Sequence, residues 1–237
     1  MTHKAIVMGS TGLVGQHLLR QLAESGDYSE VIAITRRNTL PDHPLIKPLL
    51  VTDFAQLAEA LAHLDLQDAD AFNVLGTTIK QAGSQAKFRA VDHGYAVSFA
   101  RACLERGARH FLLLSATGAN PHSKIFYNQI KGETERDIRS LGFLNYSIFQ
   151  PSLLLGEHQD ARLGEHLAQQ AFAWVKAIIP PTFAYRPIEA ERVAQSMAVA
   201  AMSAAAQANS AAPQALAMRE HLYSNVDMLA LTLENAP

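Results

Sequence analysis

Residues 5–15 read AIVMGSTGLVG, a short apolar run followed by a turn that contains three glycines. Apolar residues then recur at helical spacing as far as Gly26, and residues 31–34 (VIAI) form a second continuous apolar run. A strand, a glycine turn, a helix and a second strand in this order predict a βαβ unit. Because both strands are apolar along their whole length, we expect them in a parallel sheet that is covered on both faces.

The alternation of strand-like and helix-like segments continues along the chain. Further strands are predicted at residues 45–51, 69–75, 110–114 and 145–149, and helices at 54–61, 84–106 and 124–141. Parallel strands joined by right-handed crossovers place helices on both faces of a sheet. The sequence therefore predicts an α/β fold, a doubly wound (Rossmann), mostly parallel sheet with a small C-terminal elaboration.

The C-terminal third has a different pattern. Apolar residues at helical spacing predict a helix over 163–178, which contains Trp174, and an alanine-rich helix over 192–207; no element is assigned to the last thirty residues. The Trp174 helix is expected to pack on the sheet, with a dimer face or a wall of the substrate cleft as alternatives. Because the chain has neither an internal repeat nor a linker rich in Gly or Ser, we predict one domain over 1–237. Its nucleotide-binding core covers about 1–155, and a small substrate-side part covers about 156–237.

Composition disfavours several classes of partner. Twenty Lys+Arg and twenty-two Asp+Glu give a net charge of −2, so nucleic acid and anionic membranes are not expected partners. The apolar runs are shorter than the ~18–20 residues of a membrane span.

The single cysteine, Cys103, cannot form an internal disulfide, and in its apolar stretch it is expected to pack as a small hydrophobe. The chain begins with strand-like sequence and no leader peptide, so we expect a cytoplasmic protein.

The glycine turn between the first strand and the first helix predicts a phosphate site. Glycines permit a tight turn and let backbone N–H groups approach a pyrophosphate, to which the helix N-terminus adds roughly half a positive charge. An unliganded turn is the alternative, but a position between an apolar strand and an amphipathic helix is the context that dinucleotide binding requires. The expected contacts are Gly9, Ser10, Thr11, Gly12, Leu13, Val14 and Gly15.

The residues after the second strand indicate which dinucleotide binds. NAD-selective sites offer a carboxylate to the ribose about twenty residues beyond the glycines, whereas this chain has Arg36 and Arg37 there. Two guanidiniums can pair with the 2′-phosphate of NADPH, and a solvated arginine pair is the alternative. We therefore expect NADP(H), with NAD(H) left open. Asp53, after the third strand, can accept from the adenine amine, and a helix N-cap explains it equally well.

Three further residues indicate proton-transfer chemistry. Tyr127 and Lys131 lie four positions apart, which places them on one helix face, and Ser115 follows the fifth predicted strand. A phenol ionises at a pH of about 10, and a neighbouring ammonium favours its ionised form, which suits a tyrosine to act as an acid or base. A serine hydroxyl can hold the substrate oxygen as charge develops. A Tyr-x-x-x-Lys pair occurs by chance in many helices, and here its position behind a nucleotide turn makes it informative.

These motifs resemble the short-chain dehydrogenase/reductase superfamily, in particular its atypical members. Arg36-Arg37 and the segments 75–78, 111–115, 131–133 and 146–149 are similar to the Tat-interacting-protein-like oxidoreductases and their bacterial relatives, over about residues 4–200. The resemblance implies a proton donor at Tyr127, assisted by Lys131 and Ser115. The cofactor contacts that it implies are Leu75, Gly76, Thr77, Tyr127, Lys131, Leu154 and Arg162.

Two positions depart from the pattern of these relatives. Gln150 stands where they commonly have an arginine before the proline, which weakens a polar contact. Ala116 stands where a second serine is usual, so either Ser115 or Thr117 supplies the hydroxyl.

The leading hypothesis is an NADP(H)-dependent oxidoreductase that transfers hydride to or from a small carbonyl or alcohol compound. The alternative is an NADP(H)-sensing regulatory or scaffold protein without turnover. A sugar-nucleotide epimerase or dehydratase needs a larger C-terminal domain than about eighty residues provide. The identity of the small-molecule substrate and the oligomeric state, a homodimer included, stay open.

Ten histidines raise the question of a metal site. None of them form a His-x-x-x-His pair, and Glu157-His158 and Glu165-His166 have no further ligand at a diagnostic spacing. We therefore expect solvated histidines and no metal.

Overall fold

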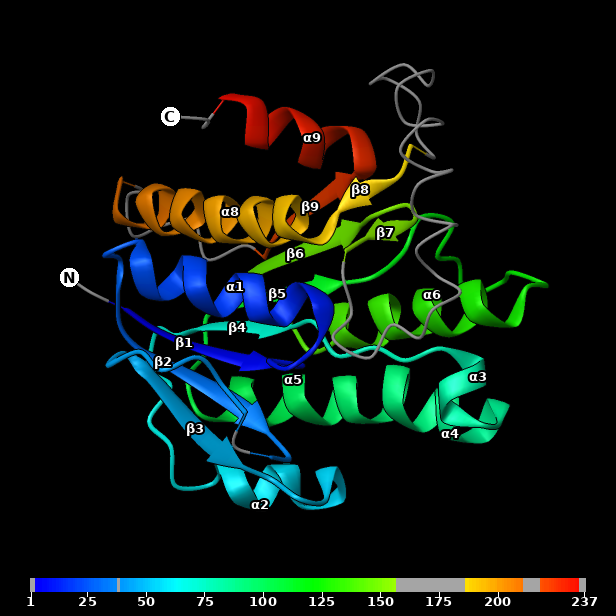
Figure 1. Cartoon of the computed structure of the whole chain (residues 1–237), viewed down its shortest axis with the longest axis horizontal. Helices are drawn as coiled ribbons and strands as arrows, with labels where there is room; N and C mark the ends of the chain where they lie inside the picture. Colours follow the sequence, from blue (N-terminus) through cyan, green and yellow to red (C-terminus); the bar gives the residue numbers. More distant parts are fainter. Residues whose placement is uncertain (1–2, 38, 157–185, 211–217, 235–237) are drawn as a thin grey trace.

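The computed structural model describes residues 3–37, 39–156, 186–210 and 218–234. In this part of the chain, parallel strands form one seven-stranded sheet in the order β3-β2-β1-β4-β5-β6-β9 (Figure 1). Its strands are β1 (His3–Met8), β2 (Tyr28–Thr35), β3 (Ile46–Leu50), β4 (Asp70–Asn73), β5 (His110–Leu114), β6 (Asn145–Gln150) and β9 (Arg219–Ser224). The first six positions follow the order of a doubly wound dinucleotide-binding sheet. The predicted fold class is confirmed.

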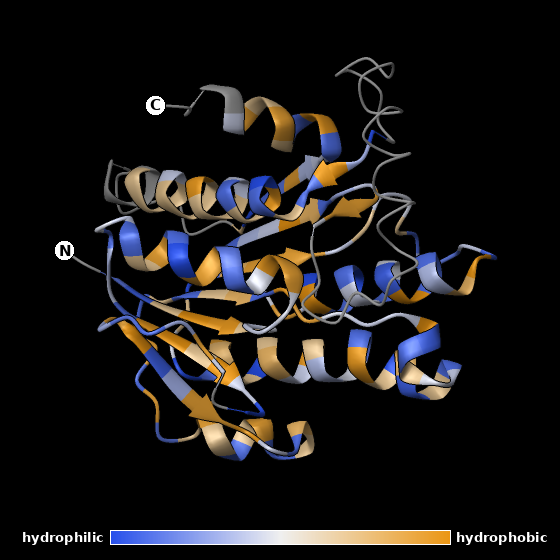
Figure 2. Ribbon diagram, in the orientation of Figure 1, coloured by the Kyte–Doolittle hydropathy of each residue, from blue (hydrophilic) through white to orange (hydrophobic). Residues whose placement is uncertain are grey.

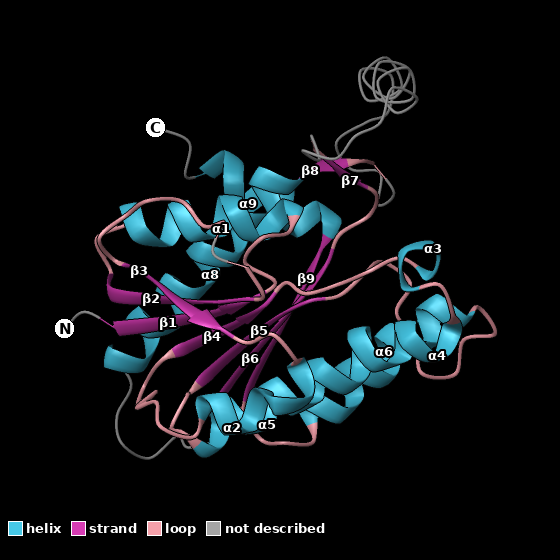
Figure 3. Ribbon diagram, turned by 60° about the horizontal axis from the view of Figure 1, so that its bottom comes forward, coloured by secondary structure: helices cyan, strands magenta, loops and turns pink. Residues whose placement is uncertain are grey.

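Helices cover both faces of this sheet (Figure 3). One face carries α1 (Leu13–Glu24), α8 (Ala190–Ser210) and α9 (Asn225–Glu234). The other carries α2 (Leu57–Leu61), α5 (Ala96–Glu105) and α6 (Phe126–Arg139). Within the described residues, no helix has both the length and the apolarity to cross a membrane.

Short elements complete the described structure. They are the 3₁₀ turn η1 (Phe54–Gln56), the helices α3 (Ile79–Ala82) and α4 (Gln85–Arg89), the π-helical turn η2 (Ala90–Tyr95), and the paired strands β7 (Leu154–Leu155) and β8 (Ile188–Glu189).

The core lies in two layers, one on each face of the sheet. Figure 2 shows apolar residues along the strands and on the helix sides that face them. The layer between the sheet and the helices α2, α5 and α6 contains an aromatic cluster around Phe111. The Phe111 ring centroid lies 5.8 Å from that of Phe99 and 5.0 Å from that of Phe143. Cys103 is fully buried in the same layer, and burial raises the pKa of its thiol well above its ordinary value. Its predicted role as a packed hydrophobe is confirmed.

The structure differs from the sequence-based expectations in several places. The short elements α3, β7 and β8 were not predicted, and the predicted helix over 54–61 begins as the 3₁₀ turn η1. The predicted helix over 84–106 contains the wider π-helical turn η2 between α4 and α5. The last thirty residues, to which no element was assigned, include β9 and α9, and β9 pairs with β6 along its whole length. The predicted helix over 163–178, with Trp174, lies outside the described residues.

Replacing Phe111 with alanine is expected to lower the free energy of unfolding by about 3–5 kcal/mol, because the surrounding rings cannot collapse fully into the space. Urea denaturation measures this loss. The matched control is Leu50→Ala at the end of edge strand β3, where the side chain is 58% exposed and the expected loss is about 0.5 kcal/mol or less. Similar losses in the two variants would contradict the buried position of Phe111.

Candidate functional site

A cleft of about 600 Å³ opens at the carboxyl ends of β1, β4 and β5. Its size suits a small-molecule or cofactor site. The strand order reverses between β1 and β4, which is where open α/β sheets bind their ligands. The predicted site residues that line this cleft are Gly12, Leu13, Val14, Leu75, Gly76, Thr77, Ser115, Tyr127, Lys131 and Leu154.

Gly12, Leu13 and Val14 of the glycine turn line the cleft, while Gly9 and Gly15 hold the turn in place through very close backbone contacts. Gly9 has a φ of +90°, and a Cβ atom there would lie 2.4 Å from the Leu75 amide nitrogen. A Cβ atom on Gly15 would lie 2.2 Å from the Gly9 carbonyl oxygen. Both positions therefore require glycine, because any side chain would push α1 and β4 away from the end of β1.

The N-terminus of α1 is open to an anion. Gly12 is the N-cap residue, so no side chain caps the first amides, and the first turn contains no acidic residue. Free amides and the helix dipole together suit a phosphate group. Ser10 contributes through its backbone only, because its buried hydroxyl donates to the Ile34 carbonyl at 2.6 Å. The turn thus fits the pyrophosphate of a dinucleotide.

Arg36 and Arg37 are exposed directly after β2. The Arg36 guanidinium lies 5.9 Å from the centre of the Phe54 ring, a cation–π contact that restricts its orientation. Neighbouring Asp53 caps η1, since its side chain accepts from the Ala55 amide at 2.9 Å. This hydrogen bond supports the interpretation of Asp53 as an N-cap residue. Arg162 lies outside the described residues.

The structure brings the three candidate catalytic residues to one wall of the cleft. Tyr127 and Lys131 are one turn apart on α6, and Ser115 follows β5 directly. The Lys131 ammonium lies 6.0 Å from the centre of the Tyr127 ring. Thr117, the alternative hydroxyl, donates to the Gln150 carbonyl at 2.9 Å and does not line the cleft. This arrangement favours Ser115.

Lys131 is held by a buried partner that the sequence did not reveal. Its ammonium pairs with Asp92 Oδ1 at 2.7 Å, and Asp92 Oδ2 accepts from the Thr77 amide at 3.0 Å. Burial lowers the pKa of Lys131, but the combined influence of Asp92, Tyr127 and Glu135 outweighs burial, and the net pKa lies above its ordinary value. Lys131 therefore stays a cation beside Tyr127.

The position of Asp92 depends on the π-helical turn. Asp92 lies in η2 and is 3% exposed. A π-helical turn inserts an additional residue into a helix and often marks a functional position. An acidic residue within an apolar helix was the signal available in the sequence, but helical spacing does not show which element it faces.

Glu135 is the second site residue that sequence reasoning missed. It lies one turn beyond Lys131 on the same face of α6, and it is 7% exposed. Its Oε1 accepts from the Ser115 hydroxyl and, at 2.9 Å, from the Gln150 side-chain amide. Burial raises the pKa of the Glu135 carboxyl. These two hydrogen bonds and the charges of Arg139 and Lys131 lower it in part, and the net pKa lies above its ordinary value.

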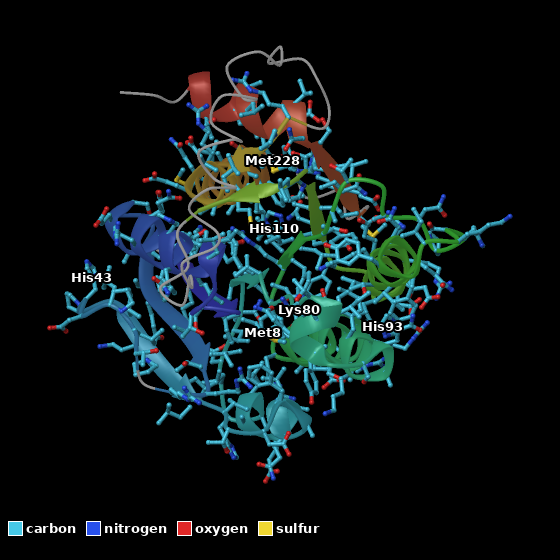
Figure 4. All side chains as sticks on the ribbon, turned by 45° about the vertical axis from the view of Figure 1, so that its right-hand side comes forward. Met8, His43, Lys80, His93, His110 and Met228 are labelled. Atoms are coloured by element: carbon cyan, nitrogen blue, oxygen red, sulfur yellow. The ribbon has the colours of Figure 1, made fainter. Side chains whose placement is uncertain are left out.

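Histidine positions give no support to a metal centre. Figure 4 shows His43, His93 and His110 in separate parts of the molecule. Within the described ranges, no three histidine, cysteine or acidic side chains gather as metal ligands would. His110 lies between Asp70, at 3.5 Å, and Ser147, at 2.9 Å, but all three are about 1% exposed and do not line the cleft. This buried group joins β4, β5 and β6 and does not form a hydrolytic triad.

Comparison with known proteins identifies the family. A family model described as NAD(P)H-binding matches residues 9–173. The chain belongs to this NAD(P)H-binding family. A protein of Debaryomyces hansenii named FMP52, mitochondrial, is 34% identical over 192 residues, which are 81% of this chain and 84% of that protein.

One further relative agrees with this family assignment, and one solved structure has the same fold. Rat HTATIP2 is 34% identical over 175 residues, 73% of this chain and 72% of that protein, which confirms the resemblance to the Tat-interacting-protein-like oxidoreductases. An oxidoreductase of the short-chain dehydrogenase/reductase family from Burkholderia thailandensis has the same fold, with a TM-score of 0.66, 18% identity, and coverage of 100% of this chain and 99% of that one.

The expectation of a cytoplasmic protein is wrong by the same comparison. The Debaryomyces hansenii relative and several other fungal relatives are named as mitochondrial proteins. That expectation had depended on the lack of a readable leader peptide, which does not determine a compartment.

Replacing Gly15 with alanine is expected to weaken dinucleotide binding by about tenfold or more, because the new Cβ atom displaces the amides that contact the phosphates. Isothermal titration calorimetry with NADPH measures this change. The control is Gly26→Ala, where φ is positive (+79°) and no atom lies within 4 Å of the new Cβ. That variant loses stability through backbone strain and keeps its affinity. Equal loss of affinity in both variants would contradict a role of this turn in binding.

Proposed function

We propose that this protein is an NADP(H)-dependent oxidoreductase of the short-chain dehydrogenase/reductase type that acts on a small carbonyl or alcohol compound. The observation that carries the proposal is the convergence of Ser115, Tyr127 and Lys131 on the cleft that the glycine turn borders. When a dinucleotide is bound there, its nicotinamide supplies or accepts a hydride. The protein then has to position the substrate and transfer one proton to or from its oxygen.

Tyr127 is the proton donor for carbonyl reduction and the acceptor for alcohol oxidation. Its half-buried phenol lines the cleft, and its ring packs against that of Phe88, with the ring centroids 5.6 Å apart. Lys131 remains charged through its pair with Asp92, and a fixed positive charge favours the phenolate that forms when Tyr127 gives up its proton. Ser115 holds the substrate oxygen at the end of β5.

NADP(H) is the proposed dinucleotide because of the two arginines after β2. No carboxylate directly follows this strand, and Arg36 is oriented by the Phe54 ring. A guanidinium in that position forms a charge-assisted pair with a 2′-phosphate, whereas a 2′-hydroxyl offers it no negative charge to pair with.

The substitution Tyr127→Phe is expected to lower kcat for carbonyl reduction by about 10²–10⁴-fold, because it removes the transferable proton and keeps the ring. Affinity for NADPH should change little. A carbonyl panel followed by NADPH absorbance gives the substrate and the rate. Tyr95→Phe is the control, since Tyr95 packs edge-on against Phe54 and does not line the cleft.

Unchanged turnover in Tyr127→Phe would contradict the proposed acid–base role. Full NADPH affinity together with no turnover of any carbonyl or alcohol by the wild-type protein would instead favour a protein that binds NADP(H) without chemistry.

The substitution Arg36→Ala is expected to weaken NADPH binding by about 10–100-fold and to leave NADH binding nearly unchanged, because a charge-assisted hydrogen bond contributes about 1.5–3 kcal/mol. Fluorescence titration with both dinucleotides measures the ratio. Arg20→Ala, an exposed arginine on α1, is the control and should affect neither. Equal affinities of the wild-type protein for NADPH and NADH would contradict the proposed preference.

A further inference from the structure

The hydrogen bond between Ser115 and Glu135 constrains what the serine can do. An ionised carboxylate has no proton to donate, so the Ser115 hydroxyl must point its hydrogen at Glu135 Oε1. In that state the serine offers only lone pairs to the cleft. A carbonyl oxygen that gains negative charge needs a donor, and a hydroxyl has one hydrogen.

A protonated Glu135 reverses this hydrogen bond. The carboxyl O–H then donates to Ser115 Oγ, and the serine hydrogen is free to turn into the cleft. No proton leaves either group in this step, because only the directions of the hydrogen bonds change. Ser115 thus becomes a donor to the substrate while Glu135 stays neutral.

Among the described residues, no cation forms an ion pair with Glu135, although the charges of two cations on α6 lower its pKa in part. Lys131 and Arg139 lie one turn before and one turn after it on α6, and both have other partners. Lys131 pairs with Asp92 of η2, and Arg139 makes two hydrogen bonds of 2.6 and 2.7 Å to Glu220 of β9.

From β6, Glu135 meets two neutral groups. The Gln150 amide donates to Oε1, and the Tyr146 hydroxyl donates to the Glu135 backbone carbonyl at 3.3 Å. In the described part of the chain, Glu135 forms no ion pair. Burial without a paired cation favours the neutral carboxylic acid, which agrees with the raised pKa of Glu135.

We propose that Glu135 is a positioning residue whose protonation turns the Ser115 hydroxyl from the carboxylate toward the substrate oxygen. This inference rests on the proposed function, in which Ser115 holds that oxygen. The protonated fraction of Glu135 falls as the pH rises through its raised pKa. Carbonyl reduction should therefore slow over the same pH range, by about tenfold per pH unit once Glu135 is mostly ionised.

Two substitutions should change this pH dependence in different ways. In Glu135→Gln, an amide N–H can donate to Ser115 at every pH, so the part of the decline of kcat that follows the ionisation of Glu135 is expected to disappear. In Gln150→Arg, a cation beside the carboxylate keeps Glu135 ionised to lower pH, so the decline should begin about 1–3 pH units lower. A purely structural role of Glu135 would alter the rate at all pH values and would not move the decline.

The experiment measures kcat for NADPH-dependent carbonyl reduction against pH in wild type, Glu135→Gln and Gln150→Arg. Glu133→Gln is the matched control, because Glu133 lies on the same helix but pairs with Arg89 at 2.6 Å and does not line the cleft. It should keep the wild-type profile. A decline that persists unchanged in Glu135→Gln, or one that Gln150→Arg leaves in place, overturns the proposal.

A second measurement does not depend on activity. Carbon-13 NMR of the glutamate carboxyls, with Glu135→Gln for assignment, follows the titration of Glu135 in the wild-type protein. A titration at or below the ordinary range of a carboxyl overturns the inference, and a raised one supports it. Ser115→Ala removes a donor to the carboxylate and should raise the pKa of Glu135 further.

The two readouts also separate this inference from the proposed function. Unchanged turnover in Tyr127→Phe would remove the proposed chemistry, and the carboxyl titration would still decide the state of Glu135. Loss of turnover in Tyr127→Phe, together with an unaltered pH decline in Glu135→Gln, would retain the chemistry and overturn the role of Glu135.

Discussion

The contact between the Gly9–Gly15 turn and the end of β4 determines the geometry of the whole site. At Gly9 the backbones of β1 and β4 approach so closely that a single methyl group would collide with Leu75. At Gly15, in α1, a methyl group would collide with the Gly9 carbonyl oxygen of the turn. This close approach brings the uncapped amides of α1 beside the loop at 75–77, and the two together form one side of the cleft. A bulkier turn would separate the uncapped amides of α1 from the proposed catalytic residues.

The opposite wall depends on α6, where Tyr127, Lys131 and Glu135 follow one another at four-residue spacing. Each buried ionisable group on this face has a partner from a different element, Asp92 for Lys131 and Ser115 for Glu135. A buried ion pair contributes little net stability but is costly to break, so such partners hold a side chain in one orientation. The two partners differ in charge. Lys131 forms an ion pair with the Asp92 carboxylate, whereas Glu135 accepts hydrogen bonds from neutral donors.

Much of this arrangement could be predicted from local sequence. Continuous apolar strands that alternate with amphipathic helices indicate a parallel, doubly wound sheet, since only strands covered on both faces are apolar throughout. The order of the glycine turn, Ser115, Tyr127 and Lys131 was informative because parallel strands bring their carboxyl ends to one edge. Strand β9 was not predicted, since its exposed and half-buried residues alternate on an edge strand and leave a weak apolar pattern.

The amino-acid sequence by itself determined the first six strands, the glycine turn and the spacing of Tyr127 and Lys131, because each of these follows from residues close together in the chain. Only the tertiary structure decided the partners of Lys131 and Ser115. Asp92 and Lys131 are separated in the chain by α5 and β5. Asp92 pairs with the lysine from a π-helical turn, whose presence helical spacing does not reveal. Glu135 matches the periodicity of an ordinary solvated helix face. Its burial, and hence its chemistry, exists because α6 packs against the ends of β5 and β6.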